Sequence, residues 1–102
     1  MKLLTKENLK ALPPLYSTEN NPEAKVGVKF FGIGNAGAWT WYAFEFDGSD
    51  TLFGLVDGHE PEWGYFSLAE LSSLRWAGIP AVERDRYYTP ETKAALAKRL
   101  GA

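Results

Sequence analysis

The sequence predicts an α+β domain, with two or three short helices packed on a single, mainly antiparallel sheet. Three observations support this class. Apolar and polar residues alternate through residues 25–31, further runs of β-forming residues are separated by the short turns DGSD (47–50) and DGHEPE (57–62), and helix-capping residues stand near both ends of the chain. Strands joined by short turns pair as antiparallel neighbours.

A chain of 102 residues can enclose one hydrophobic core, so we assign residues 1–102 to one domain. The hydrophobic content of 45% is typical of a globular protein. Cysteine is absent, which excludes disulfide bonds and thiol chemistry and suits a reducing compartment. No apolar run approaches the length of a membrane span. We therefore expect a cytoplasmic protein that does not use a membrane.

The N-terminal half predicts one helix followed by a meander. Thr5 is expected to cap the helix, Leu9 and Leu12 to form its buried stripe, and Pro13 and Pro14 to end it. The four expected strands span 25–31, 39–47, 51–56 and 63–66, and the glycine-rich GIGNAG turn (32–37) joins the first two.

The C-terminal half predicts two helices and a further extended segment. Ser67 and Glu70 form a capping box, and the apolar stripe behind it is Leu68, Leu71 and Leu74. Residues 79–88 are expected to be extended and to supply a fifth strand. Thr89 as cap and Pro90 as first residue predict a last helix within 90–102. Its stripe is thin, mainly Leu96 and Leu100, so we expect it to pack loosely.

The strand over 39–47 carries aromatic residues at both even and odd positions, and alternate side chains of a strand point to opposite faces of its sheet. The even positions predict a core, consisting of Val26, Val28, Phe30, Thr40, Tyr42, Phe44 and Phe46, joined by Leu52 and Val56. The odd positions give Trp39, Trp41, Ala43, Glu45 and Asp47, extended by Phe53, Leu55, Trp63 and Tyr65. Either a helix covers this odd face, or its tryptophans form a contact surface.

The stretch between Lys29 and Arg75, which contains the aromatic strand over 39–47, is also acidic. Between Lys29 and Arg75 the chain has no Lys or Arg but holds seven carboxylates. Nucleic-acid binding requires the opposite charge, whereas exposed Trp and Tyr are enriched in protein-binding sites. We therefore predict a non-enzymatic module that binds an unknown protein, with a homodimer as an option. The candidate binding residues are Trp39, Trp41, Glu45, Asp47, Trp63 and Tyr65.

Two other functions remain open. Trp39, Trp41 and Trp63 could be stacking platforms for single-stranded nucleic acid. Asp57, His59 and Glu62 could hold a divalent metal for a hydrolase, although such a short motif is weak. The glycines of GIGNAG do not follow a dinucleotide or P-loop pattern, and no nucleophile stands near a base. We therefore predict no catalytic residue and no cofactor.

The segment VERDRYY (82–88) is dense in charge. On a strand, Glu83 and Asp85 would point to one side, and Arg84 and Arg86 to the other. Such charges keep an edge strand soluble. The alternative is that one arginine reaches the acidic segment, within the chain or across a dimer.

Several blocks together resemble one bacterial family. KLLTKENLKALPPLYS, VKFF, WTWYAFEFDG, FGLVDGHEPEWGYFSLAEL and IPAVERDRYYTP occur in the order typical of the domain of unknown function 2958 family. The resemblance runs from Met1 to about Pro90, and the tail ETKAALAKRLGA lies outside it. It implies no catalytic residue. It does imply a context, because these small proteins are often carried by plasmids, phages and integrated elements, and the partner would then be a host factor for DNA handling or defence.

Overall fold

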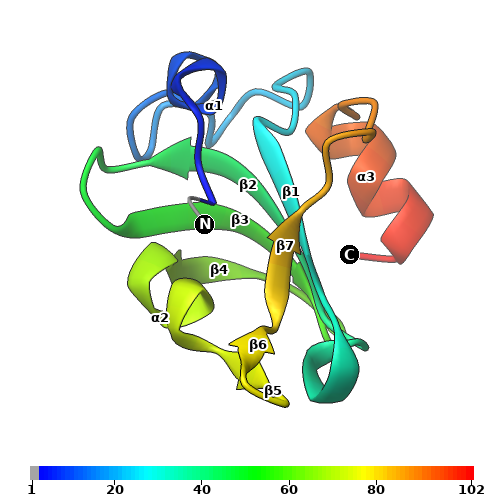
Figure 1. Ribbon diagram of the computed structural model, residues 1–102. Helices are drawn as coiled ribbons and strands as arrows, with labels where there is room; N and C mark the ends of the chain where they lie inside the picture. The colour runs from blue at the N-terminus through cyan, green and yellow to red at the C-terminus, as the bar shows by residue number, and fades with distance from the viewer. Residues whose placement is uncertain (1–2) are drawn as a thin grey trace.

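The computed structural model describes residues 3–102. The elements are α1 (Lys6–Ala11), β1 (Val28–Gly32), the short 3-10 helix η1 (Gly34–Ala36), β2 (Thr40–Phe46), β3 (Thr51–Asp57), β4 (Pro61–Ser67), α2 (Leu68–Ser73), β5 (Arg75–Trp76), β6 (Ile79–Pro80), β7 (Val82–Arg84) and α3 (Lys93–Leu100). One antiparallel sheet has the order β4-β3-β2-β1-β7, and β5 pairs with β6 in a separate hairpin (Figure 1). The α+β class, the meander and the fifth strand are confirmed.

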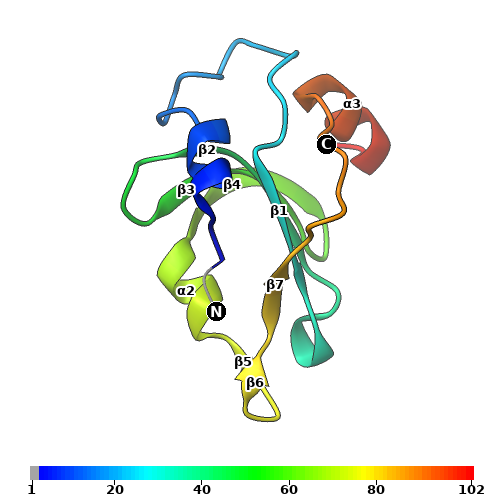
Figure 2. The same ribbon diagram turned by 45° about the horizontal axis from the view of Figure 1, so that its top comes forward.

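Each face of the sheet has its own buried core beneath short helices. On the first, face A, the core comprises Leu3, Leu12, Val28, Phe30, Trp41, Ala43, Phe46, Leu52, Leu71 and Val82. On the second, face B, it comprises Val26, Tyr42, Phe44, Leu55 and Leu96. Figure 2 shows α1 and α2 on one side of β1 and α3 on the other. A buried core therefore includes Trp41 and Ala43 of the predicted odd set, whereas Trp63 and Tyr65 remain exposed.

The prediction that the even-numbered residues of the first two strands share one core face is wrong. Val28 lies opposite Ala43, and Phe30 lies opposite Trp41, so the even side of β1 shares face A with the odd side of β2. Directly opposed residues of an antiparallel pair must point to the same face. The turn between β1 and β2 shifts the alternation by one residue, which the sequence pattern alone does not reveal.

A β-bulge in β2 reverses the alternation again. The register with β3 shifts between Ala43 and Glu45, so that Phe46 returns to face A while Glu45 lies beside Phe53 on face B. A bulge adds one unpaired residue and re-aims the side chains that follow it. Gly54 faces this bulge, and a Cβ there would stand 1.8 Å from the carbonyl oxygen of Tyr42. The close backbone approach explains the glycine.

The helices differ from prediction at three points. Thr5 caps α1 as expected, but Leu9 is exposed and only Leu12 is buried. Leu74, expected in the buried stripe after Ser67, is exposed at the end of α2. The last helix begins at Lys93 with Thr92 as its cap, not at Pro90.

The late start of α3 has a clear cause. The backbone N–H of Val26 donates to the carbonyl of Glu91 at 2.9 Å, and Lys25 bridges to Thr92. Residues 90–92 are therefore held extended beside the segment before β1. Within α3, Leu96 is fully buried on face B.

The β5–β6 hairpin was not predicted. Its two turn residues, Ala77 and Gly78, have φ values of 52° and 82°. Positive φ at both central residues is the conformation of the tightest hairpins, which favour Asn-Gly or Asp-Gly. Ala77 gives no such signal. Within residues 3–102, no helix is long and apolar enough to cross a membrane.

Candidate functional site

The structure divides the predicted binding residues between two faces. Trp39 and Trp41 lie on face A, whereas Glu45, Trp63 and Tyr65 lie on face B, and Asp47 is in the exposed turn after β2. Phe53, Leu55, Trp63 and Tyr65 do share one face, as predicted, but they share it with Tyr42 and Phe44. The six residues therefore do not form one continuous surface.

Several carboxylates of the acidic segment have a role in the fold. Asp47 accepts hydrogen bonds from the backbone N–H groups of Ser49, Asp50 and Thr51 at 2.8–3.0 Å. Asp50 accepts from the Ser67 hydroxyl at 2.6 Å and from the Ala69 backbone at 2.7 Å, at the start of α2. These bonds account for part of the acidic cluster by turn formation and helix capping.

Glu45 is a buried carboxylate that anchors a loop. Its oxygens accept from the backbone N–H of Tyr16 at 2.7 Å, from the backbone N–H of Thr18 at 2.9 Å and from the Thr18 hydroxyl. Burial alone would raise the pKa of Glu45. The bonds from Thr18 and Tyr16, together with the charge of Lys93, outweigh it and lower the pKa below its ordinary value. Glu45 is therefore a structural anion, not a contact residue.

The Trp39 pocket lies on face A between η1, the start of β2 and the end of α2. It is a cavity of about 300 Å³ lined by Asn35, Ala36, Trp39, Trp41, Leu74 and Arg75. Trp39 stacks on Trp41 with ring centres 6.2 Å apart, and its other side meets the edge of the His59 ring at 5.6 Å. Trp41 is the buried member of the lining, at 7% exposed, while Trp39 is half-buried.

Exposed apolar side chains, here called the apolar rim, continue from Leu74 in the pocket lining into the β5–β6 hairpin that follows it. Leu74, Trp76 and Ile79 are 41%, 46% and 48% exposed, and Trp76 and Ile79 are directly opposed in the hairpin. Figure 2 shows the hairpin projecting past the end of the sheet. The Trp76 indole lies against Gly34, where a Cβ would stand 2.1 Å from the ring. The hairpin is thus packed on η1 and still presents apolar surface.

A second aromatic surface, the Trp63 patch, lies on face B. It consists of Phe53, Trp63 and Tyr65, with ring centres 6.3 Å apart for Phe53–Trp63 and 5.0 Å for Phe53–Tyr65. The Lys93 ammonium lies over the Phe53 and Trp63 rings and donates to the Thr18 carbonyl at 2.6 Å. Its charge is therefore engaged within the fold. Binding of single-stranded nucleic acid requires basic side chains along a groove, and the lysine at this patch is already engaged in the fold.

The metal-site alternative gains no support. Asp57 and Glu62 belong to successive pairs of the β3–β4 ladder and so point to opposite faces. His59 is exposed in the turn between them and packs against Trp39. Among residues 3–102, no three His, Cys, Asp or Glu side chains gather in a way that could hold a metal ion.

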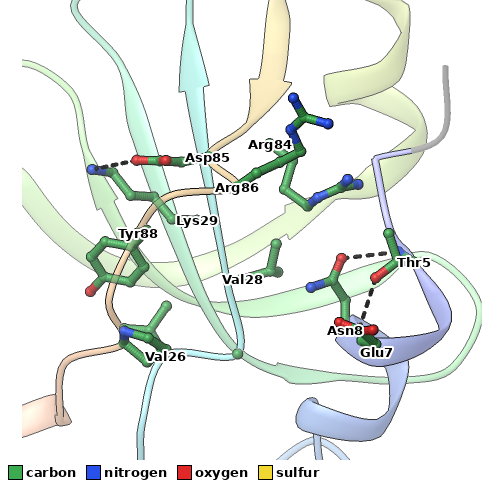
Figure 3. A pocket seen from close by; sticks show the side chains of 12 residues that line it. Thr5, Glu7, Asn8, Val26, Val28, Lys29, Arg84, Asp85, Arg86 and Tyr88 are labelled. Atoms are coloured by element: carbon green, nitrogen blue, oxygen red, sulfur yellow. Dashed lines mark hydrogen bonds and ion pairs between the residues drawn. The ribbon is translucent and has the colours of Figure 1, made fainter.

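A polar cleft of about 320 Å³ lies between α1, β1 and the segment after β7 (Figure 3). Lys29 pairs with Asp85 at 3.4 Å, and Arg84 donates to the Leu3 carbonyl at 3.3 Å. Figure 3 shows Arg84 and Arg86 on the opposite side from this ion pair. The cleft carries both signs of charge, so it suits an apolar contact less well than the Trp39 pocket.

Sequence reasoning missed Leu74, Trp76 and Ile79. The helical spacing assigned Leu74 to the core, and nothing marked the hairpin that carries the other two. A weak signal was present in RWAGIP (75–80), where two large apolar residues flank Ala-Gly.

One comparison with known proteins identifies a family. The model of a family described as "Protein of unknown function (DUF2958)" matches residues 3–100. The match includes α3. The prediction that the tail ETKAALAKRLGA lies outside the family pattern is therefore wrong. Neither the curated proteins nor the solved structures yield a match. This chain belongs to the DUF2958 family.

Proposed function

We propose that this chain is a non-enzymatic module that binds another protein through the Trp39 pocket and its apolar rim. One observation carries the proposal: a preformed hollow is lined by the buried Trp41 and the exposed Leu74, and the hairpin that follows Leu74 presents Trp76 and Ile79, each about half exposed. Large apolar side chains grouped around a hollow are typical of protein-binding sites.

The chemistry of the rim defines the contact. Arg75 uses its guanidinium to donate to the Ser72 and Leu74 carbonyls at 2.7 and 3.1 Å, which holds the rim in place. Trp39 and Trp41 supply rigid aromatic walls. We therefore expect the partner to insert an apolar side chain into the pocket.

The biological setting is part of the proposal. The family resemblance suggests a bacterial protein of mobile genetic elements, such as plasmids and phages, acting in the cytoplasm. The partner would be a host factor for DNA handling or defence, and the chain would inhibit or modulate it. Two exposed carboxylates would add charge to the contact: Glu60 follows His59, which contacts Trp39, and Glu62 lies two strands from Trp41 on the same face.

Affinity capture from a bacterial host lysate tests the function. Immobilised wild-type chain should retain a specific protein that Ile79→Glu fails to retain, because a buried carboxylate without a partner opposes docking. Ile79 is about half exposed in the hairpin, so the substitution should leave the fold intact.

Tyr87→Glu is the matched control. Tyr87 is 88% exposed and lies outside both the pocket lining and the β5–β6 hairpin, so the same charge change there should leave capture unaltered. Equal capture by the wild type and Ile79→Glu, or equal loss in both variants, would contradict the proposed site.

A further inference from the structure

The two edges of the sheet are built differently. β7 pairs over three residues and is followed at once by further charge, so Glu83, Arg84, Asp85 and Arg86 alternate in sign along it. β4 pairs over seven residues, has a single charged side chain at Glu62, and carries its proline at the first position. Charge and shortness block edge-to-edge pairing. Only β7 has these protections.

The alternation of hydrogen bonds along β4 shows which of its backbone groups point toward β3 and which point to the outer edge of the sheet. Leu68 donates to the carbonyl of Asp50, the residue opposite it, at 2.9 Å. Hydrogen-bonded and non-hydrogen-bonded pairs alternate along an antiparallel ladder, so Glu62, Gly64 and Phe66 bond to β3. The N–H and C=O groups of Trp63 and Tyr65 therefore point to the open edge. Pro61, which lacks an N–H, falls on the same outward phase.

A second copy fits this edge. In an isologous antiparallel pair, the twofold axis is perpendicular to the sheet and each face of the sheet continues into the second copy. Two residues that oppose each other across the axis must therefore both have even numbers or both have odd numbers. With the axis beside Gly64, each Trp63 exchanges backbone hydrogen bonds with Tyr65 of the second copy. Their side chains meet as aromatic cross-strand pairs, a favourable combination. Glu62 then lies opposite Phe66, so no like charges meet.

The same operation fails at β7. If even-numbered residues of the two copies oppose each other, arginines meet arginines at positions 84 and 86. If odd-numbered residues oppose each other, carboxylates meet carboxylates at positions 83 and 85. Like charges directly opposite destabilise a strand pair. The charge pattern thus favours self-association through β4 and disfavours it through β7.

We propose that β4 pairs with β4 of a second copy, antiparallel and centred on Gly64, to form one continuous ten-stranded sheet. Space on face A is consistent with this arrangement, because a Cβ added to Gly64 meets nothing within 4 Å. The surface is separate from the Trp39 pocket, so the dimer and the capture of another protein are tested independently.

The mass in solution is the first test. Size-exclusion chromatography with light scattering over a concentration series should show a species of twice the 11.4 kDa chain mass. Gly64→Lys should weaken this dimer at least about tenfold, because two ammonium groups would then face each other across the axis. Ala69→Lys adds the same charge at an exposed site of α2 and should leave the dimer unchanged.

A cross-link fixes the register. The chain has no cysteine, so Gly64→Cys introduces one thiol. Opposed residues of a non-hydrogen-bonded pair stand about 4.5 Å apart at Cα, within disulfide range. Oxidation should give a covalent dimer with Gly64→Cys and not with Ala69→Cys. A monomer at all concentrations, a dimer insensitive to Gly64→Lys, or equal cross-linking of both cysteine variants would overturn the proposal.

Discussion

Trp41 is packed between Trp39, the β1 core and the end of α2, although the sequence placed it on a candidate contact surface. Because it is a large buried side chain, Trp41→Ala should lower the free energy of unfolding by about 3–5 kcal/mol. Tyr42→Ala, on the opposite face, should cost a similar amount. Urea unfolding measures both. A loss below about 1 kcal/mol at Trp41 alone would contradict the burial of face A.

Glu45 predicts a specific response to acid. Its pKa is lowered in the folded state, so its stabilisation is complete above its ordinary pKa of about 4.3 and is lost as pH falls through the lower folded-state value. Glu45→Gln should cost about 1–3 kcal/mol at pH 7, because the N–H groups of residues 16 and 18 lose their charged acceptor. The difference from wild type should narrow below pH 4. A pH-independent difference would exclude ionised Glu45 as the anchor.

At the scale of elements, two glycines on neighbouring strands give a matched comparison. Gly54 and Gly64 are directly opposed, yet a Cβ at Gly54 would meet the Tyr42 carbonyl while one at Gly64 meets open space. Gly54→Ala should therefore cost about 1–3 kcal/mol or more. Gly64→Ala should be neutral or slightly stabilising. Thermal unfolding measures the stability of both variants. Equal losses of stability would contradict the close approach of Gly54 to the bulge in β2.

The β5–β6 turn carries strain that can be relieved. Ala77 has φ 52°, a conformation that costs an ordinary residue about 1–2 kcal/mol and that Asn adopts more readily. Ala77→Asn should raise the free energy of unfolding by about 0.5–1 kcal/mol. Ala69→Asn, in α2, is the control and should be destabilising, since Asn is a poorer helix former than Ala. No gain from Ala77→Asn would argue against the left-handed turn.

The elements were predictable where local signals dominate. Thr5 and Ser67 cap their helices, and the strands lie close to their expected positions, because capping and alternation are properties of short segments. The face of the sheet on which each side chain lies was not predictable. The parity shift between β1 and β2, the bulge after Ala43 and the pairing of residue 91 with residue 26 are all set by contacts between distant segments.

The candidate site follows the same division. Trp39 and Trp41 were identified from the odd positions of the strand over 39–47, and both line one pocket in the structure. The rim residues Leu74, Trp76 and Ile79 depend on where the chain turns after α2. That turn has an alanine at positive φ where Asn or Asp is usual, so the sequence marks it only weakly.

At the scale of the whole molecule, the sheet separates three regions. Helices cover part of each face, the Trp39 pocket opens at one end beside the projecting hairpin, and the β4 edge carries the Trp63 patch. The proposed docking site and the proposed self-association edge therefore do not overlap. The interior aromatics form the core, and the half-exposed ones lie at the two proposed contact surfaces.

The most direct measurement uses the four tryptophan indole N–H signals in a nitrogen-15 NMR spectrum, recorded with and without the captured protein. Binding through the Trp39 pocket should shift the signals of Trp39 and Trp76 and leave that of Trp63 in place, at concentrations where the chain's own association state is constant. Shifts confined to Trp63, or an unchanged spectrum with the partner bound, would contradict the pocket as the binding site.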